Sequence, residues 1–160
     1  MLCFGSCKHN RMTRCGIGPE FSIITVICGV LASWLTHIYP QLVIRGIPFW
    51  VFLVTGSVLV IKGVIDYIRA LCIFNKAYQA KKLITYGPYA KVRHPIYAAW
   101  IIFICPGVVL LFRSWPMLLL PVIAYLSFKI SIHREDSYLQ DKFGQEYLDY
   151  RAETNELFGF

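Results

Sequence analysis

Charged side chains are scarce in this chain of 160 residues: 16% are Asp, Glu, Lys or Arg, against about 25% in a typical soluble domain. Hydrophobic residues make up 57% of the chain and are gathered in blocks. The length fits one domain of ordinary size. The shortage of charge and the blocked hydropathy exclude an ordinary soluble domain and indicate an integral membrane protein.

Cysteine pairs of the C-x-x-C type are also absent, although the chain has six cysteines. A zinc site usually needs such spacing, so we expect no metal site. We expect free thiols rather than disulfides, because the cytoplasm is reducing. The positive charges, described below, place the N-terminal tail on that side of the membrane. Palmitoylation of Cys3, Cys7 and Cys15 in that tail stays open.

Four apolar blocks predict four transmembrane helices, at residues 21–39, 49–74, 96–112 and 115–132. At about 1.5 Å per residue, a helix of about 20 residues crosses a hydrocarbon core of roughly 30 Å. The last two blocks are joined by two residues, so they must form an antiparallel hairpin. Pro106-Gly107 and Pro121 are expected to interrupt them. The predicted fold is an all-α polytopic membrane protein.

The positive charges predict the topology. The net charge is +7, and the cations cluster before the first block, between the second and third, and after the fourth. The positive-inside rule then places residues 1–20, the polar loop 75–94 and the C-terminus in the cytoplasm. Membrane topology, rather than nucleic-acid binding, accounts for this charge. The host membrane stays open between a bacterial or archaeal inner membrane and the endoplasmic reticulum.

Two further patterns concern helix faces. Lys62, Asp66 and Arg69 share one face of the second span and are interpreted as pairing with each other, with a role in lining a site as the alternative. Leu139, Phe143 and Tyr147 recur every four residues and predict a C-terminal amphipathic helix.

Polar and ring side chains gather just before the third block, in Arg93-His94-Pro95-x-Tyr97. Pro95 disfavours helical geometry at His94 and suits the first turn of a helix. Arg93 and His94 are therefore expected at a helix N-terminus, where backbone N–H groups favour an anion such as a carboxylate or phosphate. Tyr97, with Tyr89 upstream, offers a flat ring with a hydroxyl tip, which suits a purine or a ribose.

Glu135 supplies the other half of the predicted site. It lies at the end of the fourth block, and the short hairpin returns it to the membrane side of His94. A carboxylate there suits a ribose hydroxyl or an ammonium group. We therefore predict Arg93, His94 and Glu135 as the catalytic residues.

Three motifs follow one another in the second half of the chain. They are Leu83-Ile84-x-x-Gly87-x-Tyr89, Arg93-His94-Pro95-x-Tyr97 and Glu135-Asp136-x-x-Leu139-x-x-x-Phe143-Gly144-x-Glu146-Tyr147-x-x-Tyr150. With them, residues 74–150 resemble the catalytic half of the membrane methyltransferases typified by isoprenylcysteine carboxyl methyltransferase. Phospholipid N-methyltransferases share the broad pattern.

The resemblance implies one membrane methyltransferase domain over residues 1–160: a tail (1–20), two N-terminal spans (21–74) and a cofactor-binding and catalytic half (75–160). It implies S-adenosylmethionine as cofactor, in a cytosol-facing pocket under the polar loop and the C-terminal helix. The residues that it places against this cofactor are Gln79, Lys82, Leu83, Ile84, Tyr89, His94, Pro95, Ile96, Tyr97 and Glu135.

The implied reaction is in-line displacement at the sulfonium methyl by a lipophilic acceptor from the bilayer. An isoprenylcysteine carboxylate is the first candidate, with a phospholipid or a small hydrophobic thiol or amine as the alternative. Two positions depart from the isoprenylcysteine enzymes, because Ser131 and Glu153 stand where those enzymes carry arginine. The oligomeric state stays open.

Two interpretations from other classes remain at this point. One is a membrane reductase using NADPH, since sterol reductases carry a related Arg-His-x-Asn-Tyr pattern, although this chain has no asparagine there. The other is a non-catalytic membrane scaffold built round Lys62, Asp66 and Arg69.

Overall fold

The computed structural model describes residues 18–80 and 82–158, and within these ranges the chain is all-α, as predicted. The expectations for residues 1–17, including Cys3, Cys7 and Cys15, lie outside the described residues, as does Lys81. The elements are α1 (Gly18–Ile38), η1 (Pro40–Leu42), α2 (Phe49–Ala80), η2 (Gly87–Ala90), α3 (Pro95–Ala98), the π-helical segment η3 (Ala99–Ile104), α4 (Cys105–Phe112), η4 (Pro116–Leu118), α5 (Leu119–Phe143) and α6 (Gln145–Glu153).

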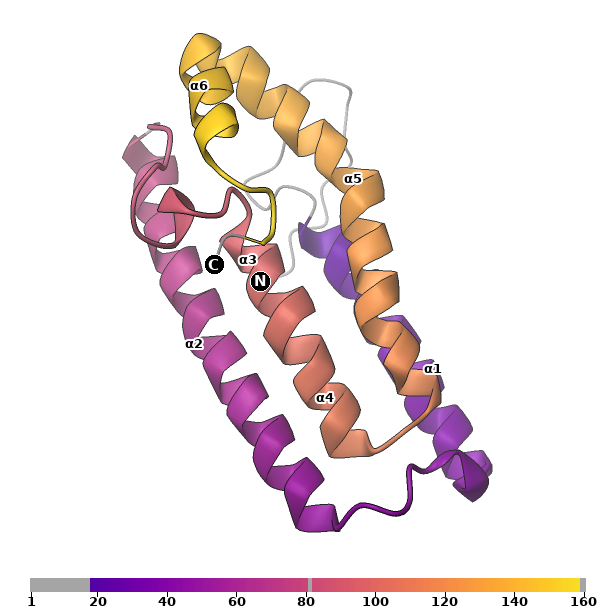
Figure 1. Cartoon of the computed structure of the whole chain (residues 1–160). Helices are drawn as coiled ribbons and strands as arrows, with labels where there is room; N and C mark the ends of the chain where they lie inside the picture. Colours follow the sequence, from indigo (N-terminus) through magenta and orange to yellow (C-terminus); the bar gives the residue numbers. More distant parts are fainter. Residues whose placement is uncertain (1–17, 81, 159–160) are drawn as a thin grey trace.

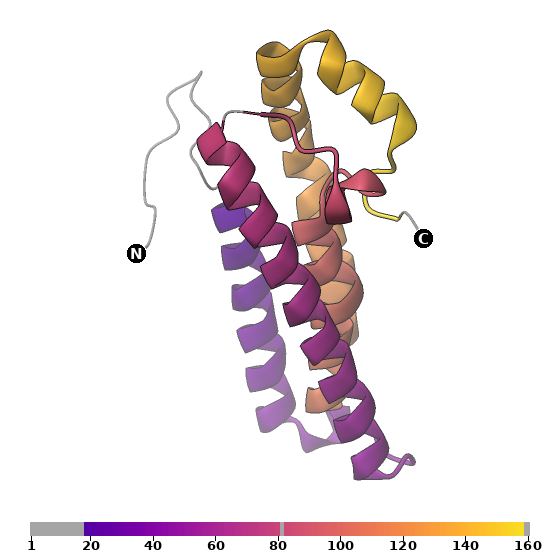
Figure 2. The same ribbon diagram turned by 90° about the vertical axis from the view of Figure 1, so that its left-hand side faces the viewer.

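Four helical segments are long and apolar enough to cross a bilayer: Gly18–Ile38, Phe49–Ala80, Pro95–Phe112 and Pro116–Phe143. They correspond to the four predicted spans, so the chain is a polytopic membrane protein. The continuous segment formed by α3, η3 and α4 packs against α2 on one side and α5 on the other, and α1 packs on α5 (Figure 1). The loop before η2 and helix α6 lie at the same end of this bundle (Figure 2).

A stripe of small residues sets the packing of α2. Gly56, Gly63, Ala70 and Ala77 recur every seven residues, and all four are buried. A Cβ atom added to Gly56 would lie 2.9 Å from the carbonyl oxygen of Gly107 in α4. Small residues on one face let two helices approach backbone to backbone, which gains dispersion contacts where no hydrophobic effect drives association.

Helix α2 is longer than the second span predicted at residues 49–74. Helix α2 continues to Ala80, so the polar loop predicted at 75–94 starts after that residue. Residues 75–80 contain neither glycine nor proline, and Ala77 continues the small-residue stripe beyond the apolar block. Packing therefore extends the helix where hydropathy alone ends it.

The prolines of the hairpin have different effects. Pro106 follows the π-helical segment Ala99–Ile104, whose wider turns change the hydrogen-bonding register before the proline ring is reached. Pro121 lies in the first turn of α5, where an N–H has no helical partner in any case, so the expected interruption at this residue is wrong.

The segment predicted as a C-terminal amphipathic helix is divided between two helices, α5 and α6. Helix α5 continues to Phe143. Gly144, with φ of 57°, then interrupts the helical conformation before α6 begins. Leu139 and Phe143 therefore belong to α5, whereas Tyr147 belongs to α6 and is 1% exposed. A positive φ favours glycine, so the break is encoded at Gly144.

The interpretation of the charges in α2 as paired is confirmed for two of them. Lys62 Nζ lies 2.6 Å from Asp66 Oδ2, one helical turn away. The same ammonium lies 4.4 Å from the ring centroid of Phe103 in η3, within the range of a cation–π contact. Arg69 is exposed on the same helix.

Candidate active site

Pro95 begins helix α3, as predicted, and His94 precedes it in a non-helical conformation with φ of −123° and ψ of 60°. His94 is 4% exposed. Its ring packs against Phe128 of α5 and Tyr97, with ring centroids 5.7 Å and 6.1 Å away. The proline therefore turns the chain so that the imidazole points into the bundle rather than toward solvent.

The hairpin brings Glu135 to His94, as predicted. Tyr97 donates a hydrogen bond to Glu135 Oε2 at 3.1 Å, and His94 Nδ1 lies 3.9 Å from Glu135 Oε1. The Glu135 side chain is 17% exposed. A carboxylate that is partly desolvated interacts more strongly with a positive or hydrogen-bond-donating group than an exposed one does.

Asp136 is the residue that the sequence interpretation missed. His94 Nε2 lies 3.2 Å from Asp136 Oδ1, Tyr147 donates a hydrogen bond to the same oxygen, and Arg93 Nη1 lies 3.9 Å from Oδ2. One carboxylate thus ties the loop before α3 to α5 and α6. The Arg93 Nε and Nη1 atoms are buried and have no hydrogen-bond partner among the described residues.

A signal for Asp136 was present in the spacing. Phe128, Ile132 and Asp136 recur every four residues, and all are buried. A carboxylate on a buried stripe needs hydrogen-bonding partners, so its position predicts contacts with other polar groups.

Three tyrosine hydroxyls near the site are kept in their protonated form. Tyr150 donates to the backbone carbonyl of Tyr89 at 2.7 Å, and burial raises the pKa of Tyr150 to about 12. Burial, and next the charge of Glu135, raises the pKa of Tyr89. Burial, and next the hydrogen bond to Asp136, raises the pKa of Tyr147. These hydroxyls therefore stay neutral at physiological pH.

A C-terminal strap, residues 155–157, completes the surroundings of His94. The backbone N–H of Arg93 donates to the carbonyl of Asn155 at 2.8 Å, and that of His94 donates to the carbonyl of Glu156 at 3.3 Å. Figure 1 shows the chain returning from α6 to the start of α3. Leu157 anchors the strap in the core, and Lys129 of α5 forms an ion pair with Glu156.

The remaining predicted contact residues lie at different depths. Pro95 is buried and Ile96 half-buried beside His94. Leu83 and Ile84 are half-buried in the loop after α2, whereas Gln79 and Lys82 are exposed at the end of α2 and the start of that loop. The two positions that depart from the isoprenylcysteine enzymes also differ in burial. Ser131 is half-buried one turn before Glu135, and Glu153 is exposed at the end of α6.

These features define a four-helix membrane protein with a partly buried carboxylate–histidine site at one end of the bundle. The model of the phospholipid methyltransferase family matches residues 43–146, and the chain belongs to this family. Over 86 residues it is 32% identical to a protein of Tribolium castaneum named Protein-S-isoprenylcysteine O-methyltransferase. That match covers 51% of this chain and 31% of the relative, so the chain spans about a third of the relative's length.

Proposed function

We propose that this chain uses S-adenosylmethionine to methylate a lipophilic acceptor taken from the membrane. The observation that carries the proposal is the pairing of His94 and Glu135 across the hairpin, at the loop end of the bundle. Membership of the phospholipid methyltransferase family supports it. Both termini and the loop before α3 face the cytoplasm in this proposal, because the cations cluster there.

The residues at the site fit this cofactor. Glu135 has the charge and the partial burial to hold an ammonium group or a ribose hydroxyl. Arg93 has buried guanidinium nitrogens that lack a hydrogen-bond partner among the described residues, and they suit a carboxylate. Tyr97 orients the Glu135 carboxylate through its hydroxyl.

The cofactor supplies an electrophilic methyl group on a positively charged sulfur. The residues of the chain then contribute mainly position and charge complementarity, which are the main requirements when the electrophile is already reactive. The buried rings round His94 exclude water from this end of the site. A carboxylate acceptor needs no general base.

Among acceptors, an isoprenylcysteine carboxylate is the first candidate, supported by the name of the Tribolium castaneum relative. Ser131 and Glu153 weaken that choice, because neither supplies the positive charge that would hold a carboxylate. The alternative is a phospholipid or a small hydrophobic thiol or amine, and the family match supports the phospholipid.

Calorimetric titration with S-adenosylhomocysteine tests the cofactor, with NADPH titrated in parallel. We expect binding of S-adenosylhomocysteine alone, and at least tenfold weaker binding in Glu135→Gln, because a hydrogen bond to a charged group contributes about 1.5–3 kcal/mol. Glu153→Gln removes an exposed carboxylate from α6 and is expected to bind like the native chain.

Each contrary result has a distinct meaning. Binding of NADPH alone would favour the reductase. Binding of neither ligand by folded protein would favour a scaffold. Unchanged affinity in Glu135→Gln would place the cofactor elsewhere in the molecule.

A further inference from the structure

Three cations form a stripe along the membrane-spanning helix α2. Lys62, Arg69 and Lys76 recur every seven residues, which is close to two helical turns, and all three are exposed. We call these three residues the cationic stripe. Each of them directly precedes a residue of the buried small-residue stripe, so the cationic stripe runs beside the packed face of α2, on the outer surface of the bundle.

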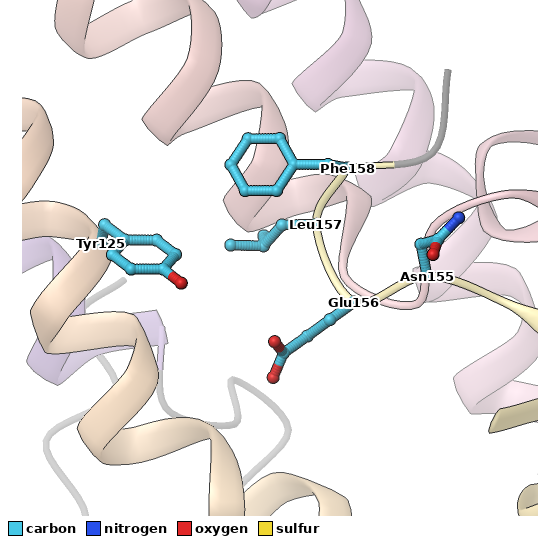
Figure 3. A pocket seen from close by; sticks show the side chains of 5 residues that line it. All are labelled: Tyr125, Asn155, Glu156, Leu157 and Phe158. Atoms are coloured by element: carbon cyan, nitrogen blue, oxygen red, sulfur yellow. The ribbon is translucent and has the colours of Figure 1, made fainter. Parts of the chain in front are cut away.

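Two members of the cationic stripe, Arg69 and Lys76, have no ion-pair partner within residues 18–80 and 82–158. Three other cations of the membrane-spanning segments are paired with carboxylates: Lys62 with Asp66, Lys129 with Glu156 and Arg134 with Glu20. Glu156 reaches Lys129 from the wall of the pocket between α5 and the strap (Figure 3). Pairing within the chain neutralises these three cations and leaves the charges of Arg69 and Lys76 to an anion from outside it.

Arg69 lies at the depth where hydrocarbon gives way to lipid headgroups. Trp50 at the start of α2 and Trp115 in the turn between α4 and α5 are 65% and 56% exposed, as in the aromatic belt at a membrane surface (Figure 1). A hydrocarbon core of roughly 30 Å corresponds to about 20 residues of helix, which puts Arg69 at the opposite boundary. Lys76 lies about 10 Å farther along the axis. The two flexible side chains therefore approach the level of the lipid phosphates from either side.

We propose that Arg69 and Lys76 bind the headgroup of an anionic phospholipid, at a site separate from the candidate active site and independent of the proposed function. A guanidinium binds a phosphate through two parallel hydrogen bonds, and the nearby ammonium adds a second positive charge. Ile65 and Ile61, one and two turns before Arg69, are 43% and 59% exposed at hydrocarbon depth. They offer contact to acyl chains, which favours a lipid over a water-soluble anion.

The charges on this face also select the kind of headgroup. A zwitterionic headgroup carries an ammonium group that needs an anion of its own. The carboxylate next to the cationic stripe, Asp66, is already engaged by Lys62, whose Nζ lies 2.6 Å from Asp66 Oδ2. Arg69 and Lys76 therefore match a headgroup with a net negative charge and offer nothing to the positive end of a zwitterionic one.

Native mass spectrometry of the chain released from nanodiscs tests this assignment. The nanodiscs contain equal parts of phosphatidylglycerol and phosphatidylcholine, and the lipids that stay bound are counted. We expect the native chain to retain about tenfold more phosphatidylglycerol than phosphatidylcholine, which is about 1.4 kcal/mol and matches the contribution of one or two cations near an anionic surface. The double variant Arg69→Gln with Lys76→Gln is expected to retain the two lipids equally.

A second double variant, Lys91→Gln with Arg151→Gln, is the matched control. It removes the same charge from exposed positions in the loop before α3 and in α6, and it is expected to keep the preference. Equal retention of the two lipids by the native chain would overturn the proposal. An unchanged preference in the Arg69 and Lys76 variant would also overturn it, and so would an equal loss in the control, because net charge alone would then select the lipid. An unshifted thermal unfolding midpoint shows that each variant is folded.

Discussion

Asp136→Ala is expected to lower the free energy of unfolding by about 3–5 kcal/mol, the range measured when one partner of a buried ion pair is removed. The substitution leaves His94 and the Tyr147 hydroxyl without their shared acceptor, and Arg93 without its counter-charge, in a site where water does not replace the carboxylate. Denaturant titration of the detergent-solubilised protein, followed by circular dichroism, measures the change.

Two further variants make this result specific to Asp136. Asp141→Ala removes an exposed carboxylate from the same helix and is expected to change the stability by less than about 0.5 kcal/mol. Asp136→Asn keeps the side-chain volume and one acceptor oxygen, so it is expected to fall between the two alanine variants. Equal stability of Asp136→Ala and Asp141→Ala would contradict a central role for the Asp136 carboxylate.

Gly107→Leu is expected to prevent native packing of α2 on α4 or to cost several kcal/mol. Even the Cβ atom would lie 2.7 Å from Val60 Cγ2 and 2.9 Å from the carbonyl oxygen of Gly56. Backbone atoms cannot move aside as the end of a flexible side chain can, so the helices must separate and lose the contacts along the small-residue stripe. Gly107→Ala is expected to cost about 1–3 kcal/mol for the same reason.

Gly29→Ala is the matched control in another membrane-spanning helix. Its Cβ atom would lie 3.8 Å from Leu120, which is ordinary van der Waals contact. Alanine has the higher helix propensity, by about 1 kcal/mol, so this variant is expected to be neutral or more stable. Thermal unfolding of the three variants in one detergent tests the comparison, and similar losses at both positions would contradict the steric argument.

The number of spans could be predicted because a bilayer requires about 20 consecutive apolar residues for each helix. Their ends could not be predicted from hydropathy, since α2 and α5 continue past the apolar blocks into polar sequence. For α2, the missing information lay in the spacing of Ala70 and Ala77 from Gly63. For α5, it lay in Gly144, the residue at which the helix stops.

Part of the candidate site could also be predicted, because a short connection between two helices limits which residues can meet. A short turn at residues 113–115 fixes the register of the hairpin, so the approach of Glu135 to His94 followed from the sequence and is confirmed. The strap could not be predicted, because Asn155 and Glu156 reach the loop through main-chain carbonyls, which every residue carries. The cofactor contacts of Gln79 and Lys82 stay predictions.

The strap has a consequence for the order in which the molecule assembles. Arg93 and Asn155 are 62 residues apart in the chain, and closing a loop of that length costs about 4 kcal/mol in chain entropy. Once α4 and α5 are paired, the open loop shrinks to the 19 residues between Asp136 and Asn155, and the cost falls to about 3 kcal/mol. Closing the strap therefore costs about 1 kcal/mol less in chain entropy once α4 and α5 are paired, which favours its docking onto an assembled bundle.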